Sequence, residues 1–319
     1  MTAQTFELTI TDLHRLKRNV LWVTLSPREG FELPHWSPGA HIGVHLTDDL
    51  IRQYSLCGDS DDQTVYRIAV QLEPESRGGS QFIHENWKLG QAVTVEAPRN
   101  NFELVEAPSY LFIAGGIGIT PLLPMIKKAE DEGRIWALSY RGRSRQDMPF
   151  ANSLVRNLGD NVTILASDEG NRLSVKEIVG EPVPGRAIYC CGPTAMLDDA
   201  EALARSSSLA PDETMHLERF VNAHAVPDDG DHEFDVELAQ SGRTLTVPAD
   251  KTVIDTLEEA GVDVSYSCRE GTCGTCETEV LEGEVDHRDS ILDDDEKAAN
   301  DCMFICVSRC KGKRLVLDL

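Results

Sequence analysis

The spacing of cysteines near the end of the chain constrains its structure more than any other feature. Three of them follow a C-x4-C-x2-C pattern inside SCREGTCGTCETE: Cys268, Cys273 and Cys276. Three thiolates can surround one small centre only if the loop turns tightly, and Gly271 and Gly274 permit the unusual backbone dihedrals of such a turn. A fourth ligand must come from elsewhere in the chain. The candidates are Cys302, Cys306 and Cys310.

The number of cysteines and the ligand spacing together indicate an inorganic centre. The chain has nine cysteines, an odd count that argues against a disulfide framework. C-x4-C-x2-C followed by a distant cysteine is the spacing of plant-type [2Fe–2S] centres. Zinc sites also use four thiolates, but they usually combine two closely spaced pairs. Because the fourth ligand stands alone here, the pattern favours iron–sulfur over zinc.

Residues 233–319 resemble a plant-type ferredoxin domain, which has the β-grasp fold. The 29 residues between Cys276 and Cys306 are the separation usual in that family. The resemblance implies that Cys306 is the fourth ligand and that Cys302 and Cys310 are not ligands. The local sequence agrees, because Cys306 lies in the apolar run 303–307 whereas Cys310 adjoins the charged KGKR that follows it.

Composition excludes several classes of protein. The chain of 319 residues carries 30 basic and 54 acidic side chains, a net charge of −24. Such a surface repels nucleic acid and anionic membranes, so neither is an expected partner. No run of 18 uncharged apolar residues occurs, and the charged first 20 residues lack the apolar core of a signal peptide. We therefore expect a soluble, cytoplasmic protein.

The chain divides into three parts. Short alternating strands and one helix at Ser80–Trp87 predict an antiparallel β-barrel over residues 1–105. Strands and helices then alternate from Tyr110 to a last strand at Thr214–Phe220, which predicts a parallel α/β sheet over 106–224. The polar segment 222–232, with proline and glycine, is typical of a linker, and the ferredoxin-like domain occupies 233–319.

A glycine-rich turn, GGIGITP at residues 115–121, joins the first strand of the α/β part to its first helix. Gly116 and Gly118 let the backbone approach a pyrophosphate, whose charge a helix N-terminus favours. Thr120 is placed to cap the helix, and Pro121 suits its first turn. Pro121 occupies the last position of the Rossmann G-x-G-x-x-G fingerprint, so the turn alone is weak evidence of nucleotide binding.

A second turn strengthens that evidence. The strand ending at Cys191 is followed by Gly192 and Pro193, and ligands of open α/β sheets bind beyond the carboxyl ends of strands. Together the two turns resemble the nucleotide domain of the ferredoxin–NAD(P) reductase superfamily. The resemblance implies that one set of residues binds the pyridine nucleotide: Gly116, Gly118, Thr120, Pro121, Cys191, Gly192 and Pro193. It also implies that Cys191 approaches the nicotinamide. The alternative is a strand end with a buried cysteine.

The residues leave the nicotinamide cofactor undecided. No acidic residue follows the strand Ile135–Tyr140 to bind a ribose 2′-hydroxyl. Arg141, Arg143 and Arg145 follow instead, either to accept a 2′-phosphate or as solvated surface arginines. The family resemblance, rather than these residues, favours NADH.

The first domain carries a candidate flavin site. Nicotinamide passes two electrons and a [2Fe–2S] centre accepts one, so a flavin between them is expected. Arg52, Tyr54 and Ser55 match the R-x-Y-S motif of the same superfamily. The arginine suits a phosphate, the tyrosine provides an aromatic wall, and the serine, which we also predict to be catalytic, suits the flavin edge.

Four residues open the helix of the first domain: Arg77, Gly78, Gly79 and Ser80. Free amides, a hydroxyl and an arginine at a helix N-terminus suit one terminal phosphate, which favours FMN over FAD. Phe220 resembles the aromatic residue that shields the flavin until nicotinamide displaces it. The alternative for Phe220 is a core position on the last strand.

The order of the three domains resembles the phthalate dioxygenase reductase and vanillate demethylase reductase family. This resemblance implies that NADH reduces FMN, that FMN reduces the [2Fe–2S] centre, and that the centre reduces a separate Rieske-type oxygenase. The alternatives are an electron-carrier module and a general NAD(P)H:acceptor or flavin reductase. The ferredoxin-like part holds 21 acidic and 9 basic residues, and this charge suits either docking or solubility alone.

Overall fold

The computed structural model of the chain describes residues 4–29, 31–47, 50–73, 78–206, 208–220 and 230–319. Their contacts divide the chain into two compact units, one formed by Thr5–Arg219 and one that contains Phe220–Leu319. Within the described ranges, no helix is long and apolar enough to cross a membrane.

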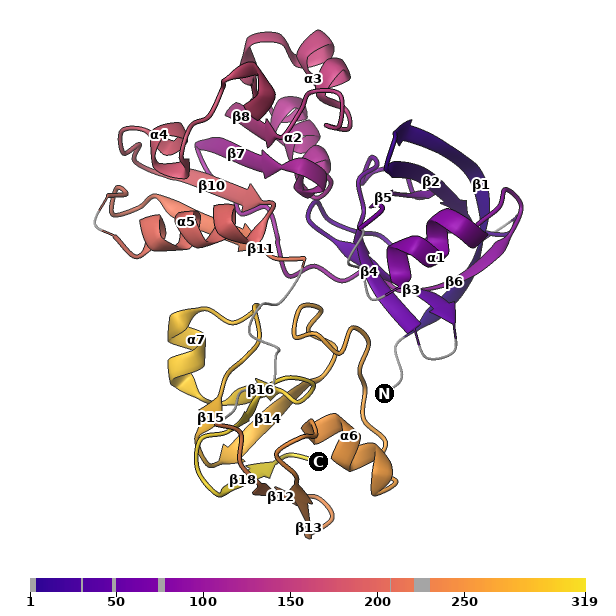
Figure 1. The fold of residues 1–319 in the computed structure, drawn as a ribbon, viewed down its shortest axis with the longest axis vertical. Coiled ribbons are helices and arrows are strands. Elements are labelled where there is room, and N and C mark those ends of the chain that lie inside the picture. The colour runs from indigo at the N-terminus through magenta and orange to yellow at the C-terminus, as the bar shows by residue number, and fades with distance from the viewer. Residues whose placement is uncertain (1–3, 30, 48–49, 74–77, 207, 221–229) are drawn as a thin grey trace. The chain divides into compact units, whose positions relative to one another are not determined.

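The larger unit begins with a six-stranded antiparallel sheet (Figure 1). Its elements are β1 (Thr5–Lys17), β2 (Val20–Ser26), β3 (His41–Thr47), β4 (Leu50–Ser55), β5 (Tyr66–Gln71), α1 (Gly79–Asn86) and β6 (Ala92–Glu96). The strands lie in the order β4-β3-β6-β1-β2-β5, and two bulges bend the long strand β1. Bulges increase the local twist, so the sheet curls around a core that includes Ile10, Ile42 and Val95. The predicted antiparallel β-barrel is confirmed.

A five-stranded parallel sheet completes the larger unit. Its strands are β7 (Ser109–Gly115), β8 (Ile135–Gly142), β9 (Val162–Ala166), β10 (Arg186–Cys191) and β11 (Thr214–Glu218). Its helices are α2 (Leu122–Asp131), α3 (Ala151–Leu158), α4 (Val175–Val179) and α5 (Thr194–Ala204), with short 3-10 turns at Gly116–Ile119, Gly159–Asn161 and Ser167–Glu169. The strand order is β11-β10-β7-β8-β9. The chain therefore leaves β7 towards β8 on one side and returns through β10 on the other, so a topological switch point lies between β7 and β10.

The smaller unit is built on a mixed sheet with the strand order β13-β12-β18-β14-β16. Its elements are β12 (Phe234–Leu238), β13 (Arg243–Val247), α6 (Val253–Glu259), β14 (Glu277–Glu282), β15 (Val285–Asp286), α7 (Asp294–Ala299), β16 (Cys302–Phe304), β17 (Arg309–Cys310) and β18 (Arg314–Leu317). Strands β12 and β18 are parallel, although they come from opposite ends of the domain. Apolar side chains of α6 pack into the same core as the sheet. This arrangement agrees with the predicted β-grasp fold.

The helix predicted at Ser80–Trp87 and the strand predicted at Ile135–Tyr140 form within two residues of those bounds. The last strand of the α/β part ends at Glu218 rather than at Phe220. A 3-10 turn at Gly116–Ile119 separates β7 from α2, which begins at Leu122. The predicted boundary near residue 105 lies inside the larger unit, and most of the predicted linker 222–232 lies outside the described residues.

Candidate functional site

The two turns singled out in the sequence meet at the switch point of the parallel sheet. A Cβ added to Gly118 would lie 2.3 Å from the carbonyl oxygen of Cys191, and one added to Gly115 would lie 2.5 Å from Cδ of Pro193. Because no Cβ tolerates such distances, only glycine allows the turn after β7 to approach the turn after β10. Gly116 also has a positive φ of 56°, which favours glycine.

A cavity of about 1120 Å³ opens beside these turns. Gly115, Gly116 and Pro193 line it from the parallel sheet, and Gln71 and His84 line it from the barrel. Its volume lies above the usual range for sites of drug-sized ligands and suits a dinucleotide. Gly116 and Pro193 are thus the predicted nucleotide residues that reach the cavity wall.

The other predicted nucleotide residues lie behind this wall, and one expectation about them is wrong. Thr120 does not cap α2, because its buried hydroxyl donates to the carbonyl oxygen of Ile117 at 2.9 Å. Pro121 occupies the N-cap position, which has no side-chain cap. The 3-10 turn that precedes α2 moves the helix start two residues beyond Thr120. Gly118 and Gly192 instead allow the two turns to pack closely: a Cβ on Gly118 would meet Cys191, and a Cβ on Gly192 would meet the backbone of Gly115.

The carboxyl ends of β10 and β11 bring a thiol and a carboxyl together. Cys191 and Glu218 are direct neighbours across the parallel pair, and the Cys191 Sγ donates to Glu218 Oε2 at 3.7 Å. Burial raises the pKa of Glu218 to about 8, although its hydrogen bond with Cys191 opposes the shift. Burial, followed by the neighbouring carboxyl, also raises the pKa of Cys191. The carboxyl therefore binds its proton more tightly than an ordinary glutamate does.

Sequence reasoning missed Glu218, although it lies two residues before Phe220 in MHLERF. The alternating pattern of the sequence places Glu218 on the last strand. Its partner Cys191 can be identified only once the register of β10 and β11 is known. Phe220 lies beyond the end of β11 with 39% of its surface exposed, so it is not a core residue. The intervening Arg219 pairs with Asp198 and Glu201 at 3.0 and 2.7 Å and fixes the end of β11 to α5.

The two parts of the predicted phosphate site also come together. Gly79, at the start of α1, packs so closely against Arg52 on β4 that an added Cβ would lie 2.7 Å from Arg52 Cγ. Gly78 is the N-cap of α1 with a φ of 86°. A guanidinium therefore lies beside a glycine-rich helix N-terminus, a combination that fits a terminal phosphate. The predicted Arg77 lies outside the described residues.

The remaining predicted flavin residues belong to the barrel wall. Tyr54 packs against the barrel core, and Ser55 is buried at the end of β4 opposite His41. The Ser80 hydroxyl accepts a hydrogen bond from the backbone N–H of Glu73 at 3.1 Å, which leaves its proton available to donate.

Four buried thiols meet in the smaller unit. The Cys268 thiol lies close to those of Cys273 and Cys306, and the Cys306 thiol also lies close to that of Cys276. These contacts hold the pKa of Cys268 well below its usual value, which favours the thiolate. Among the described residues, no group of three or more histidine, cysteine or acidic side chains has the geometry of a single-ion site. In a [2Fe–2S] centre the four thiolates are distributed over two irons, and these four fit that donor set.

The backbone around the thiols is shaped to donate hydrogen bonds to sulfur. The N–H of Glu270 donates to Cys268 Sγ at 3.3 Å, and the hydroxyl of Thr275 lies 3.1 Å from Cys273 Sγ. Arg269, Gly271 and Gly274 all have positive φ values, between 55° and 78°. This repeated reversal turns successive amides inwards, as a negatively charged iron–sulfur centre requires.

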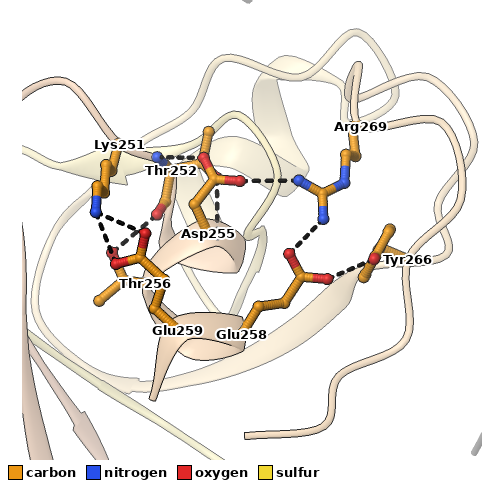
Figure 2. Close-up of polar contacts among 8 residues, drawn as sticks. All are labelled: Lys251, Thr252, Asp255, Thr256, Glu258, Glu259, Tyr266 and Arg269. Carbon is orange, nitrogen blue, oxygen red and sulfur yellow. Dashed lines mark hydrogen bonds and ion pairs between the residues drawn. The ribbon is translucent and has the colours of Figure 1, made fainter. Parts of the chain in front are cut away.

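Arg269 fastens this loop to α6, as Figure 2 shows. Its guanidinium donates to Asp255 Oδ1 at 2.8 Å and to Glu258, and it lies over the ring of Tyr266 at 4.3 Å. Asp255 is itself part of a capping box with Thr252 at the start of α6. The position next to Cys268 therefore carries a side chain that connects the ligand loop to a capped helix.

The other two cysteines of this unit have separate environments. Cys302 is partly exposed on β16, and Cys310 is buried on β17, where it pairs with Val285 of β15. Of the three candidates for the fourth ligand, Cys306 is the one with recorded contacts to Cys268 and Cys276.

Comparisons with known proteins agree with this geometry. Residues 236–311 match the family described as 2Fe-2S iron-sulfur cluster binding domain. The carnitine monooxygenase reductase subunit of Escherichia coli (strain K12) is 38% identical over 99% of this chain and 99% of its own. The structure of phthalate dioxygenase reductase aligns with a TM-score of 0.71 and 33% identity over 99% of this chain and 98% of its own.

A third similarity covers only part of a longer protein. The structure of a type IV self-sufficient cytochrome P450 monooxygenase aligns with a TM-score of 0.89 and 40% identity. The alignment covers 99% of this chain but 41% of that one, so the chain spans about two fifths of the P450 protein. The two relatives that match along their full length decide the family. The chain belongs to the oxygenase reductases, the flavin- and [2Fe–2S]-dependent oxidoreductases that include phthalate dioxygenase reductase and vanillate O-demethylase oxidoreductase.

Proposed function

We propose that this reductase takes electrons from NADH through FMN to its [2Fe–2S] centre and delivers them to a separate Rieske-type oxygenase. The observation that carries the proposal is the meeting of four buried thiols, three from one loop and one from the segment after β16, in a chain whose larger unit holds a dinucleotide-sized cavity. A two-electron donor site and a one-electron centre in one chain need a flavin between them. Bound FMN would supply this exchange between hydride and single-electron transfer.

In the smaller unit we assign four ligands to the centre: Cys268, Cys273, Cys276 and Cys306. Their thiols are already in mutual contact, and the amide of Glu270 is aimed at Cys268 Sγ. The protein's part is to bring these four sulfurs together in a buried place. This assignment fits the domain division 1–105, 106–224 and 233–319, which we retain as a proposal.

In the larger unit we assign the pyridine nucleotide to the cavity beside Gly116 and Pro193. Gly118 and Gly192 set the close approach of the two turns, with Thr120 and Pro121 behind them. Cys191 and Glu218 lie at the strand ends, where the carboxyl holds its proton until the pH exceeds about 8. Phe220, which is exposed just beyond the end of β11, is our candidate for the aromatic residue that shields the flavin.

For FMN we assign the phosphate to the site formed by Arg52 and the start of α1, with Arg77, Gly78, Gly79 and Ser80. Tyr54 and Ser55 at the end of β4 would orient the ring system. The proximity of Gly79 to Arg52 supports this assignment, since it places a guanidinium beside free helix amides.

Family membership places an oxygenase downstream of the chain, and the Rieske type is our proposal for it. The acidic ferredoxin-like part would present its charge to a basic patch of that partner. We also propose a cytoplasmic location, because none of the nine cysteines forms a disulfide, as is usual in a reducing compartment.

The test uses the purified, cofactor-loaded protein. Denaturation should release FMN, and anaerobic NADH should bleach the flavin and produce the electron paramagnetic resonance signal of a reduced [2Fe–2S] centre. Reduced protein should then reduce a Rieske oxygenase. Release of no flavin, or transfer to free flavin alone, would contradict the proposal.

Cysteine variants test the ligand assignment. Cys306→Ser should abolish reduction of one-electron acceptors while NADH still reduces the flavin. Cys302→Ser and Cys310→Ser are matched controls in the same segment, and both should keep the [2Fe–2S] signal. Loss of the signal in either control, with the signal kept in Cys306→Ser, would show that the ligand is misassigned.

A further inference from the structure

Three arginines line the dinucleotide cavity at one edge of the parallel sheet. Arg141 is the last residue but one of β8, Arg143 directly follows the strand, and Arg172 comes from the segment after β9. The Nη1 atom of Arg141 is buried and has no hydrogen-bond partner among the described residues. A buried guanidinium nitrogen without a partner is costly unless a ligand supplies the acceptor.

The position of Arg141 relative to the glycine turn indicates which part of a bound dinucleotide would lie next to this side chain. Arg141 lies beside Gly115 in the register of β8 and β7, at the carboxyl edge of the sheet. In dinucleotide-binding α/β domains, the end of the second strand recognises the adenosine ribose: a carboxylate there binds the 2′-hydroxyl, and an arginine accommodates a 2′-phosphate. Here the sequence at that point is Arg-Gly-Arg.

The nearby Arg145 differs from Arg141, because its guanidinium is already paired within the protein and is not available to bind a 2′-phosphate. Its Nε and Nη2 atoms bind the carboxylate of Glu169 at 2.9 and 3.1 Å. The charge of Arg145 is therefore neutralised by Glu169, and Arg145 lines a different, smaller cavity. Of the three arginines that the sequence places after β8, Arg141 and Arg143 remain to meet a ligand in the main cavity.

We propose that Arg141 and Arg143 form a subsite for the adenosine 2′-phosphate, so that the reductase accepts NADPH as well as NADH. This inference rests on the proposed function, since it assumes that a pyridine nucleotide occupies the cavity. Both side chains line the cavity, Arg141 with one guanidinium nitrogen buried and unpartnered in the described part of the chain, and Arg143 exposed. Arginine suits this role because its planar guanidinium makes paired hydrogen bonds to phosphate oxygens.

Calorimetric binding of 2′,5′-ADP and 5′-ADP to the FMN-loaded protein separates this subsite from pyrophosphate binding. The wild-type protein should bind 2′,5′-ADP about tenfold more tightly or better, equivalent to about 1.4 kcal/mol. Arg141→Gln should remove this preference and lower the ratio of kcat/KM for NADPH over NADH by a similar factor. Arg145→Gln is the matched control and should keep both the preference and the ratio.

Each other result overturns the inference. Equal binding of the two ADP isomers to the wild-type protein would show that the 2′-phosphate has no subsite. Equal weakening of both in Arg141→Gln would place Arg141 on a group that the two ligands share, the adenosine or the 5′-phosphate, and weakening of 5′-ADP alone would place it on the pyrophosphate. Loss of the preference in Arg145→Gln would show a general charge effect instead. If NADH reduces the flavin while the 2′-phosphate gives no advantage, the inference fails and the proposed function stands. If NADH reduces no flavin either, the proposed function fails too.

Discussion

The nucleotide edge of the larger unit and the thiol loop of the smaller one are held in place by different forces. At the nucleotide edge, two turns touch through their backbones, and the contact of Gly118 with Cys191 leaves no room for a Cβ. In the thiol loop, Arg269 connects the backbone to Asp255 and Glu258 on α6 through exposed ion pairs. The first arrangement depends on shape and the second on charge.

The two regions also differ in how they use carboxyl groups. Glu218 is half-buried beside Cys191, and the loss of solvent around its carboxyl raises its pKa to about 8. Glu258 is partly exposed, and hydrogen bonds from Tyr266 and then Arg269 hold its pKa below the usual value. The nucleotide edge should therefore respond to pH near neutrality, whereas the thiol loop should respond to salt and to acid.

Gly118→Ala should have the largest effect, because the new Cβ would meet the carbonyl oxygen of Cys191 at 2.3 Å. Overpacking against rigid backbone costs about 3 kcal/mol or more, so we expect a large drop in the free energy of unfolding and loss of NADH binding. Gly133→Ala is the control: its φ is 64° but the space around it is open, so only the left-handed strain of about 1–2 kcal/mol applies. Urea unfolding and NADH titration measure both variants. A smaller loss in Gly118→Ala than in Gly133→Ala would refute the steric argument.

Glu218→Gln should change how stability depends on pH. A carboxyl whose pKa is raised on folding binds more protons in the folded state, so its contribution is complete below about pH 4.5 and is lost as the pH rises to about 8. The wild-type free energy of unfolding should therefore fall over that interval relative to the variant, whose amide does not titrate. Urea unfolding at several pH values measures the difference. Parallel pH profiles for the two proteins would show that Glu218 is ionised and solvated.

Much of both regions could be predicted from the sequence because their signals are local. The glycine turns and the C-x4-C-x2-C loop each lie within a short segment, where backbone geometry dictates residue type. The pair of Cys191 and Glu218 could not be predicted, because strands 27 residues apart become neighbours only through the sheet register. The partners of Arg269 lie on α6, and only the folded domain shows that this helix packs beside the ligand loop. Thr120 was misassigned as a cap because nothing in GGIGITP distinguishes a helix start from a 3-10 turn.

Arg269→Gln should have the smallest of these effects, and its control breaks another ion pair to the same helix. Breaking ion pairs that are more than a third exposed costs only about 0.5–1 kcal/mol. Because these pairs fasten the residue next to Cys268, we expect iron loss to a chelator to become about two- to fivefold faster. Lys251→Gln breaks the ion pair with Glu259, also drawn in Figure 2, which joins α6 to the residues just before it rather than to the ligand loop. It should leave the rate of iron loss unchanged.

High salt should bring the wild-type rate of iron loss towards that of Arg269→Gln, since screening weakens exposed ion pairs. Equal rates in the two variants would mean that the thiol loop is held by its own backbone, as the nucleotide edge is, and the contrast between the two regions would disappear.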